Sequence, residues 1–283
     1  MHTTLVSTDV LASQLGSDWA IVDCRFDLQA DQWGRDQYLA AHIPGAVFAS
    51  IGEDLAGPKD GTNGRHPLPS IDALSATLGR LGIAPDTQVV VYDQDSGMYA
   101  SRLWWLLRYV GHPAAAVLDG GWAKWVREGR PTRSGSEQRL PTQFVAMPRR
   151  DMRMTVDDVM SHLGDPNTTL IDARGPDRFE GRSEPIDRVA GHIPGAVNRP
   201  YKDNISTGGT LLPPDQLHRQ FSQVLKGLEP TQAVMYCGSG ITACHNVLAM
   251  EHAGLPGARV YPGSWSEWSA DPSRPVEKGP SSK

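Results

Sequence analysis

The sequence HIPGAV occurs twice in this chain, at residues 42–47 and again at residues 192–197. The two copies lie 150 positions apart in a chain of 283 residues. An internal repeat with so long a period indicates a duplicated domain, and further matches around both copies would strengthen that prediction.

Three further matches flank the two copies in the same order along the chain. They pair IVDCR at 21–25 with LIDAR at 170–174, VVVY at 89–92 with AVMY at 233–236, and GWAKW at 121–125 with SWSEW at 264–268. Their offsets of 149, 144 and 143 positions drift by only a few residues. We therefore predict two homologous domains, at 1–128 and 151–270, which is also the number that this chain length favours.

The segments outside these two ranges have the composition of connecting chain. Residues 129–150 are polar and rich in Pro, Gly and Ser, which predicts a linker between the domains. Residues 271–283 show no apolar period, which predicts a flexible tail.

Short apolar runs alternate with helical stretches within each predicted domain. The runs expected as buried parallel strands are 20–23, 89–92, 117–119, 170–172, 233–236 and 259–261. Two expected helices, 98–110 and 242–253, each stop at a glycine that a proline follows two residues later. This order predicts an α/β fold in which each domain is a mainly parallel sheet with helices on both faces.

Composition and charge favour a protein that acts on small molecules. The formal net charge is -5 and Lys and Arg form no block, so neither nucleic acid nor an anionic membrane is expected as a partner. The three cysteines, Cys24, Cys237 and Cys244, lack zinc spacing, and we expect no metal and no organic cofactor. Such a sparse, odd set of cysteines is typical of free thiols, and no leader peptide or long apolar run is recognised, so we expect the cytoplasm.

The sequence CGSGI at 237–241 connects the apolar run at 233–236 to the helix expected from Thr242. A cysteine at the carboxyl end of a parallel strand faces the crevice where such sheets bind ligands. The two glycines allow successive N–H groups to turn inward, and these groups and the helix dipole favour negative charge on the sulfur. Cys237 is therefore predicted to be a thiolate nucleophile, the alternative being a small buried hydrophobic residue.

The repeat supplies an internal control for this prediction. Asp93 follows the matching strand in the first half, and an aspartate cannot hold a transferable sulfur. Domain 1 is therefore predicted to be catalytically silent and to serve as scaffold and as one wall of the site, unless it is a non-catalytic binding module.

Several of these motifs together resemble two-domain rhodaneses: the tandem HIPGAV segments, the Asp-x-Arg at 172–174, the Trp-x-x-Trp that closes each half and the loop CGSGIT at 237–242. Among rhodaneses the chain is most similar to the 3-mercaptopyruvate sulfurtransferases, whose typical loop CGSGVT differs from this one only at Ile241. Thiosulfate-type rhodaneses more often carry Arg and Lys inside the loop, and this loop has neither. The resemblance spans residues 3–268 and implies two tandem rhodanese-like domains.

The resemblance also implies roles for two arginines and for the loop. Arg178 matches an arginine that binds the substrate carboxylate, and Arg188 falls at the second such arginine. Two guanidinium groups near a thiolate can fix a carboxylate by bidentate hydrogen bonds. The loop residues expected to contact the substrate are Gly238, Gly240, Ile241 and Thr242.

A proton relay is implied as well. His66 matches a histidine proposed to form a relay with the loop serine, which in this chain is Ser239. The acid of the relay is expected shortly after the first HIPGAV, where this chain has Gly52, so only Glu53 or Asp54 can take its place.

The function implied by the resemblance is a sulfurtransferase that works by double displacement. Cys237 takes sulfur from 3-mercaptopyruvate as a persulfide and passes it to a thiol such as thioredoxin or glutathione, or to cyanide. Thiosulfate is the alternative donor, with the same persulfide mechanism. A dual-specificity phosphatase is disfavoured, because it needs an arginine six positions after the cysteine, where this chain has Ala243.

The remaining conspicuous residues are interpreted as structural. His42 and His192 recur in both halves, one of which is predicted to be silent, and Cys24 follows a buried strand. Cys244 lies inside the helix after the loop, where packing is expected and a resolving role is the alternative. Core packing is expected of Trp122, Trp125, Trp265 and Trp268.

Overall fold

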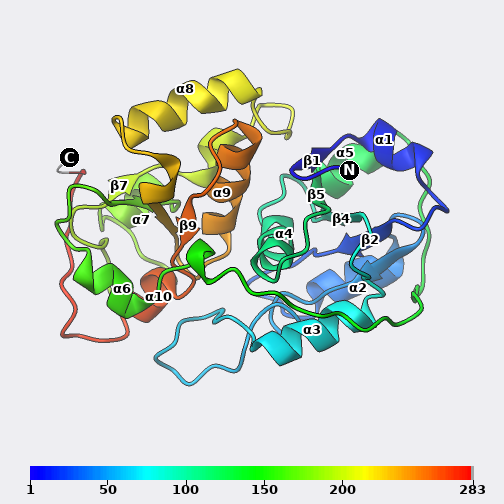
Figure 1. Ribbon diagram of the computed structural model, residues 1–283, viewed down its shortest axis with the longest axis horizontal. Coiled ribbons are helices and arrows are strands. Elements are labelled where there is room, and N and C mark those ends of the chain that lie inside the picture. The colour runs from blue at the N-terminus through cyan, green and yellow to red at the C-terminus, as the bar shows by residue number, and fades with distance from the viewer. Residues whose placement is uncertain (282–283) are drawn as a thin grey trace. The chain divides into compact units, whose positions relative to one another are not determined.

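Parallel strands form both sheets in the computed structural model, which describes residues 1–281 (Figure 1). The first sheet has five strands in the order β1-β5-β4-β2-β3, and the second has four in the order β7-β6-β8-β9. Their central strands are buried on both faces, as parallel strands covered by helices are. The predicted α/β fold with two parallel sheets is confirmed.

The chain divides into two compact units that are not simple halves of the sequence. Unit 1 comprises Met1–Gly57, Pro69–Arg149 and Thr207–Leu211. Unit 2 comprises Pro58–Leu68, Arg150–Ser206 and the chain from Leu212 onward. Residues 58–68 thus belong to the second unit although they lie within the first predicted domain, 1–128, and the predicted domain ranges stay a prediction.

Unit 1 packs its helices on both faces of the five-stranded sheet (Figure 1). Its elements are β1 (Leu5–Val6), α1 (Thr8–Ser13), β2 (Ala20–Asp23), α2 (Trp33–Ala40), β3 (Ala46–Phe48), α3 (Ile71–Arg80), β4 (Val89–Tyr92), α4 (Ala100–Tyr109), β5 (Ala115–Leu118) and α5 (Gly121–Arg127). One core cluster joins Leu11 of α1 and Trp125 of α5 to Val90 and Tyr92 of β4. Alternate residues of β4 therefore point to the face of the sheet that α1 and α5 cover.

Unit 2 repeats this arrangement on a smaller sheet (Figure 1). Its helices and strands are α6 (Val156–Ser161), β6 (Thr169–Asp172), α7 (Pro176–Phe179), β7 (Val197–Asn198), α8 (Pro214–Leu225), β8 (Ala233–Tyr236), α9 (Thr242–His252), β9 (Arg259–Val260) and α10 (Ser264–Trp268). Three short 3-10 helices add η1 (Arg150–Met152), η2 (Tyr201–Asn204) and η3 (Pro230–Gln232). Val234 and Tyr236 of β8 share a core cluster with Trp265 and Trp268 of α10, as expected of these tryptophans.

The strands and helix stops follow the sequence closely. β2, β4 and β8 coincide with the predicted ranges. β5 begins two residues before the predicted 117–119, because Ala115 and Ala116, poor strand formers by type, pair with β4 in the buried sheet. Gly111 and Gly254, which follow α4 and α9, have φ of 86° and 76°, the left-handed conformation expected of a glycine helix stop.

The predicted linker, 129–150, and the predicted tail, 271–283, make equivalent contacts in the two units. Trp125 Nε1 donates to the carbonyl of Pro131 at 2.8 Å, and Trp268 Nε1 donates to that of Pro275 at 2.8 Å. Further on, Arg133 forms an antiparallel bridge with His42, as Glu277 does with His192. The repeat therefore extends beyond the tryptophans, and each extension is held against its HIPGAV segment. Residues 282–283 of the predicted tail lie outside the described residues.

We expect truncation after Ala270 to lower the melting temperature. The truncated chain loses the bridge between His192 and Glu277 and the acceptor of the buried Trp268 indole, which costs on the order of 1–3 kcal/mol. For unit 2 this corresponds to a decrease of roughly 4–12 °C, measurable by circular dichroism. Truncation after Gly279 keeps both contacts and is the control. Equal melting temperatures for both truncations would contradict this prediction.

Within the part of the chain that the structure describes, helices with the length and apolar composition needed to cross a membrane are absent.

Candidate active site

Cys237 lies at the carboxyl end of the second sheet, between β8 and α9. Because Asp172 of β6 is in register with Tyr236 of β8, the residues that follow both strands meet at one edge of the sheet. Cys237 is 2% exposed, and its N–H donates to Ser264 Oγ at 3.1 Å. The N–H of Gly240 donates to Cys237 Sγ at 3.2 Å. The thiol is thus buried, yet a backbone donor of its own loop is directed at the sulfur.

Gly240 allows this turn. Its φ is 77°, and a Cβ at this position would lie 2.3 Å from the carbonyl oxygen of Pro262. A side chain would therefore meet rigid backbone as well as an unfavourable left-handed conformation. At position 240 only glycine allows the loop to curl around Cys237 Sγ.

The equivalent loop of unit 1 encloses a carboxylate. Asp93 follows β4 as Cys237 follows β8, and it accepts backbone N–H groups from Gly97 at 2.9 Å, Tyr99 at 2.7 Å and Ala100 at 3.0 Å. Burial raises the pKa of Asp93 to about 6, although these hydrogen bonds oppose the shift. A strand–loop–helix turn of this kind therefore presents donors to an anion, in unit 1 to the carboxylate of its own chain.

Ser239 and His66 meet as the predicted relay requires. His66 Nδ1 and Ser239 Oγ lie 2.9 Å apart, and both residues are buried. The contact forms within unit 2, because residues 58–68 belong to that unit.

The two acids considered for the relay have other partners in unit 1. Glu53 pairs with Arg35 at 3.0 Å. Asp54 accepts the N–H of Ser50 at 2.8 Å and forms an ion pair with Arg80. The part of Glu53 or Asp54 in a relay stays a prediction.

Arg178, on α7, points one of its guanidinium nitrogens at the loop. Its Nε and Nη2 donate to Glu184 at 2.8–3.1 Å, and Nη2 also lies 3.0 Å from Asp187 Oδ2. Nη1 lies 3.4 Å from the position that a Cβ of Gly238 would take. The predicted carboxylate-binding arginine thus stands beside the residue that follows Cys237.

Two buried carboxylates hold this guanidinium in place. Burial alone would raise the pKa of Glu184, but hydrogen bonds from Arg178 and from the N–H of Asp187 outweigh it and lower the pKa below its ordinary value. Glu184 also bonds Arg174 at 3.2 Å, and Arg174 in turn pairs with Asp172 at 2.7 Å at the end of β6. A chain of ion pairs that begins at the end of β6 therefore fixes the orientation of Arg178.

Arg188 is exposed, whereas its neighbour Asp187 turns inward. The second guanidinium beside Gly238 belongs to Arg65, whose Nη2 lies 2.7 Å from the position of a Gly238 Cβ. The sequence did not predict Arg65 as a site residue. Its only signal in the sequence is its position immediately before His66. The role predicted for Arg188 stays a prediction.

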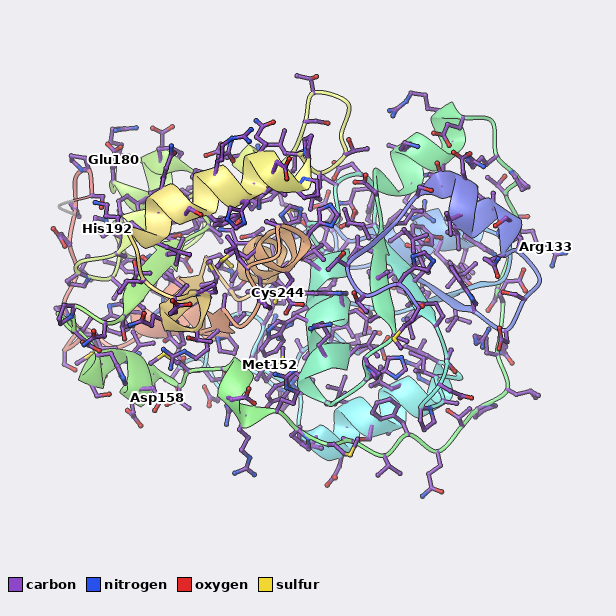
Figure 2. The ribbon with its side chains drawn as sticks, turned by 45° about the horizontal axis from the view of Figure 1, so that its top comes forward. Arg133, Met152, Asp158, Glu180, His192 and Cys244 are labelled. Atoms are coloured by element: carbon purple, nitrogen blue, oxygen red, sulfur yellow. The ribbon has the colours of Figure 1, made fainter. Side chains whose placement is uncertain are left out.

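The remaining loop residues lie at the start of α9, and the other two cysteines are buried. Ile241 is the N-cap of α9 and Thr242 its first residue. Cys244 lies buried on α9 (Figure 2), with Sγ 3.3 Å from the carbonyl oxygen of Gly240. Burial, reinforced by the charge of Asp23, raises the pKa of Cys24 well above its ordinary value, which disfavours the thiolate form.

The repeated histidines have matching environments in the two units. The His42 ring stacks on Tyr38 and bonds its carbonyl oxygen at 2.8 Å, while the His192 ring stacks on Phe179 and bonds its carbonyl oxygen at 2.7 Å. Figure 2 shows His192 away from Cys244. These contacts fit the structural interpretation of both histidines.

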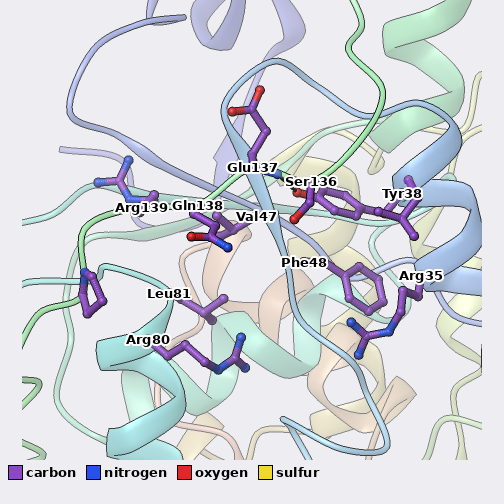
Figure 3. Close-up of a pocket in the computed structure, with 12 residues that line it drawn as sticks. Arg35, Tyr38, Val47, Phe48, Arg80, Leu81, Ser136, Glu137, Gln138 and Arg139 are labelled. Atoms are coloured by element: carbon purple, nitrogen blue, oxygen red, sulfur yellow. Dashed lines mark hydrogen bonds between the residues drawn. The ribbon is translucent and has the colours of Figure 1, made fainter.

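A separate cavity of about 370 Å³ lies in unit 1 (Figure 3). Arg35, Arg80 and Arg139 surround apolar side chains that include Val47 and Phe48. The described residues that line it include no thiol, so it is not a candidate site for holding a transferable sulfur.

Comparisons with known proteins agree with the repeat. The model of the rhodanese-like domain matches residues 7–128 and 155–271. The chain is 44% identical to a protein of Pseudomonas aeruginosa described as a probable 3-mercaptopyruvate sulfurtransferase, over 97% of this chain and 98% of that protein. It is 35% identical to the thiosulfate sulfurtransferase of Mus musculus, over 100% of this chain and 98% of that protein.

Solved structures show the same fold over nearly the full length. The crystal structure of SseA from Escherichia coli, described as a 3-mercaptopyruvate sulfotransferase of rhodanese fold, has a TM-score of 0.80 at 31% identity and covers 93% of this chain and 99% of its own. The 3-mercaptopyruvate sulfurtransferase from Leishmania major has a TM-score of 0.84 at 30% identity and covers 94% of this chain and 74% of its own.

Proposed function

This chain belongs to the rhodanese family of sulfurtransferases, and from that premise we propose that it transfers sulfur from 3-mercaptopyruvate to a thiol or to cyanide through a persulfide on Cys237. The observation that carries the proposal is the loop after β8, where the N–H of Gly240 lies 3.2 Å from Cys237 Sγ. A donor in this position stabilises negative charge on the sulfur, both as thiolate and as persulfide.

The first step forms an S–S bond and breaks a C–S bond. The Cys237 thiolate attacks the thiol sulfur of 3-mercaptopyruvate, and pyruvate leaves as its enolate, which takes up one proton at carbon. The enzyme keeps the sulfur as Cys237–S–SH. In the second step the acceptor, a thiolate or cyanide, attacks the outer sulfur and releases the Cys237 thiolate.

Ser239 and His66 are proposed to supply the proton that the pyruvate enolate takes up in the first step. The hydroxyl and the imidazole lie 2.9 Å apart in a buried pair, so a proton can pass between them. The backbone N–H groups of the loop are proposed to surround the sulfur and the donor. The loop residues in question are Gly238, Gly240, Ile241 and Thr242.

The charges around Arg178 support 3-mercaptopyruvate over thiosulfate as donor. Glu184 and Asp187 both pair with this guanidinium and offset its charge. A dianion such as thiosulfate gains more from excess positive charge than a monocarboxylate does. Thiosulfate with the same persulfide remains the second candidate, because relatives of comparable coverage carry that name.

Mass spectrometry tests the persulfide directly. After incubation with 3-mercaptopyruvate, the peptide that contains Cys237 should gain the mass of one sulfur atom, and a reducing agent should remove it. Values of kcat/KM for the two donors should favour 3-mercaptopyruvate. An active enzyme with unmodified Cys237 would refute the persulfide, and a higher value for thiosulfate would reverse the donor order.

The acceptor and the compartment are part of the same proposal. Thioredoxin, glutathione and cyanide are the acceptors proposed, and steady-state rates with each should rank them. The three cysteines are free thiols, which supports a reducing compartment such as the cytoplasm. One structural relative, at 28% identity, is described as a sulfur transferase subunit of yeast mitochondrial complex I, so fractionation of cells is the appropriate test.

A further inference from the structure

Ser264, the first residue of α10, has a left-handed backbone conformation. Its φ is 56°, which is unfavourable for a residue that carries a side chain. The equivalent position in unit 1 is Gly121, whose φ is 52°. The fold therefore needs this conformation in both units, but only unit 1 has the residue that adopts it without strain. A strained residue at this position is a reason to ask what its side chain does.

The hydroxyl of Ser264 holds the backbone of Cys237. The Ser264 side chain is fully buried, and its Oγ accepts the N–H of Cys237 at 3.1 Å. The hydroxyl donates its own proton to the carbonyl oxygen of Tyr261 at 2.9 Å. Because that proton is directed at Tyr261, a lone pair of Oγ is left for the N–H of Cys237. A glycine at position 264 would lose both hydrogen bonds.

The two residues that follow this serine hold the next part of the loop. The N–H of Trp265 donates to the Cys237 carbonyl at 2.9 Å, and the N–H of Ser266 donates to the Gly238 carbonyl at 2.9 Å. In unit 1 the two residues after Gly121 make the same pair of bonds to the two residues that follow β4, at 2.9 and 3.0 Å. These two bonds are thus common to both units, and the hydroxyl bond is what the serine adds in unit 2.

Unit 1 orders its loop by a different means. The Asp93 carboxylate accepts backbone N–H groups of its own loop at 2.7–3.2 Å. A Cβ on Gly121 would lie 2.8 Å from the Asp93 carbonyl oxygen, so a side chain has no room there. The Cys237 sulfur is a weaker acceptor than a carboxylate, and in the proposed mechanism it changes its covalent state in every turnover. A constraint from outside the loop is therefore of use in unit 2.

We propose that Ser264 is a positioning residue, whose hydroxyl fixes the peptide unit of Cys237 and so keeps Sγ where the N–H of Gly240 is directed at it. This inference rests on the proposed function, because it concerns the same sulfur. The strained backbone at position 264 is then a loss of stability accepted in return for a hydroxyl that glycine lacks.

Two substitutions separate the hydroxyl from the strain. Ser264→Gly removes the hydroxyl and relieves the strain, whereas Ser264→Ala removes the hydroxyl and retains the strain. Both should lower the rate constant of persulfide formation at saturating donor by about 10- to 100-fold, as a misplaced reacting atom does, with little change in the donor KM. The glycine variant should nevertheless melt roughly 4–8 °C above the alanine variant. Quenched time courses of the mass of the Cys237 peptide and melting followed by circular dichroism measure the two effects.

Lys226→Gly is the matched control for the relief of strain. Lys226 is the C-cap of α8, and its φ of 51° makes it the other non-glycine residue with this conformation among the described residues. Its replacement by glycine should raise the melting temperature and leave the rate constant of persulfide formation at the wild-type value. A rate constant lowered as far as that of Ser264→Gly would show that relief of strain alone slows the enzyme, and it would count against a role of the hydroxyl.

The glycine variant gives the decisive result, because glycine already occupies the equivalent position in unit 1 and should fold at position 264. Persulfide formation by Ser264→Gly at the wild-type rate would show that the hydroxyl is dispensable and would overturn the inference. A raised donor KM with an unchanged rate constant would also overturn it, because Ser264 would then act in donor binding. A wild-type enzyme that forms no persulfide with either donor would instead refute the proposed function.

Discussion

Replacement of Cys237 by serine is expected to lower the rate of sulfur transfer by at least about 10⁴-fold, as loss of a catalytic nucleophile does. A serine hydroxyl fits the space of the thiol and can accept the Gly240 N–H that now lies 3.2 Å from Sγ. It cannot form the S–S bond on which both steps depend. The fold should therefore be retained while activity is lost, as measured by thiocyanate formation from cyanide and by circular dichroism.

The other two cysteines provide the controls for this variant. Cys24 is buried with a raised pKa, so Cys24→Ser should retain the wild-type rate of transfer. Cys244 contacts the carbonyl of Gly240, a contact that a serine hydroxyl can also make, so Cys244→Ser should form the persulfide as well. Transferable sulfur found on Cys244, or an active Cys237→Ser variant, would show that the nucleophile is misassigned.

The equivalent loop of unit 1 shows that this backbone shape suits an anion. Four backbone N–H groups donate to the Asp93 carboxylate after β4, and the chain around it follows that of Cys237. Trp122 N–H donates to the Asp93 carbonyl at 2.9 Å, and Trp265 N–H donates to the Cys237 carbonyl at 2.9 Å. One backbone geometry thus surrounds a carboxylate in unit 1 and directs a backbone N–H at a thiol in unit 2.

The repeat made most of the fold predictable. Each buried strand is a short apolar run, and the glycine stops at Gly111 and Gly254 mark where α4 and α9 end. The position of Cys237 followed from the same pattern, because a residue after a parallel strand must lie at the carboxyl edge of the sheet.

Two features left no trace of this kind in the sequence. The chain after Trp268 is held by single contacts such as the bridge of Glu277 with His192, which need no apolar period. Arg65 reaches the loop because residues 58–68 leave the first unit and join the second, a long-range contact that local patterns do not encode. Both were missed because backbone pairing and tertiary placement, rather than local propensity, determine them.

Gly240→Ala is expected to lower kcat by about 10²- to 10³-fold, the effect of losing a backbone donor at a reacting anion. The new Cβ would lie 2.3 Å from the Pro262 carbonyl oxygen, and φ of 77° adds about 1–2 kcal/mol of strain for a residue with a side chain. The loop must shift, which withdraws the Gly240 N–H from Cys237 Sγ. The melting temperature should fall too, because the atoms nearest to the new Cβ are backbone atoms of Pro262, which cannot move aside as a side chain can.

Gly238→Ala is the matched variant that separates the loop backbone from donor binding. Its Cβ would meet only the ends of side chains, at 2.7 Å from Arg65 Nη2 and 3.4 Å from Arg178 Nη1, and the end of the flexible Arg65 side chain can move aside. We therefore expect a raised donor KM with little change in kcat or melting temperature. If Gly240→Ala retained kcat within a few-fold of wild type, the sulfur would not depend on the N–H directed at it, and the chemistry proposed for this loop would need another source of stabilisation.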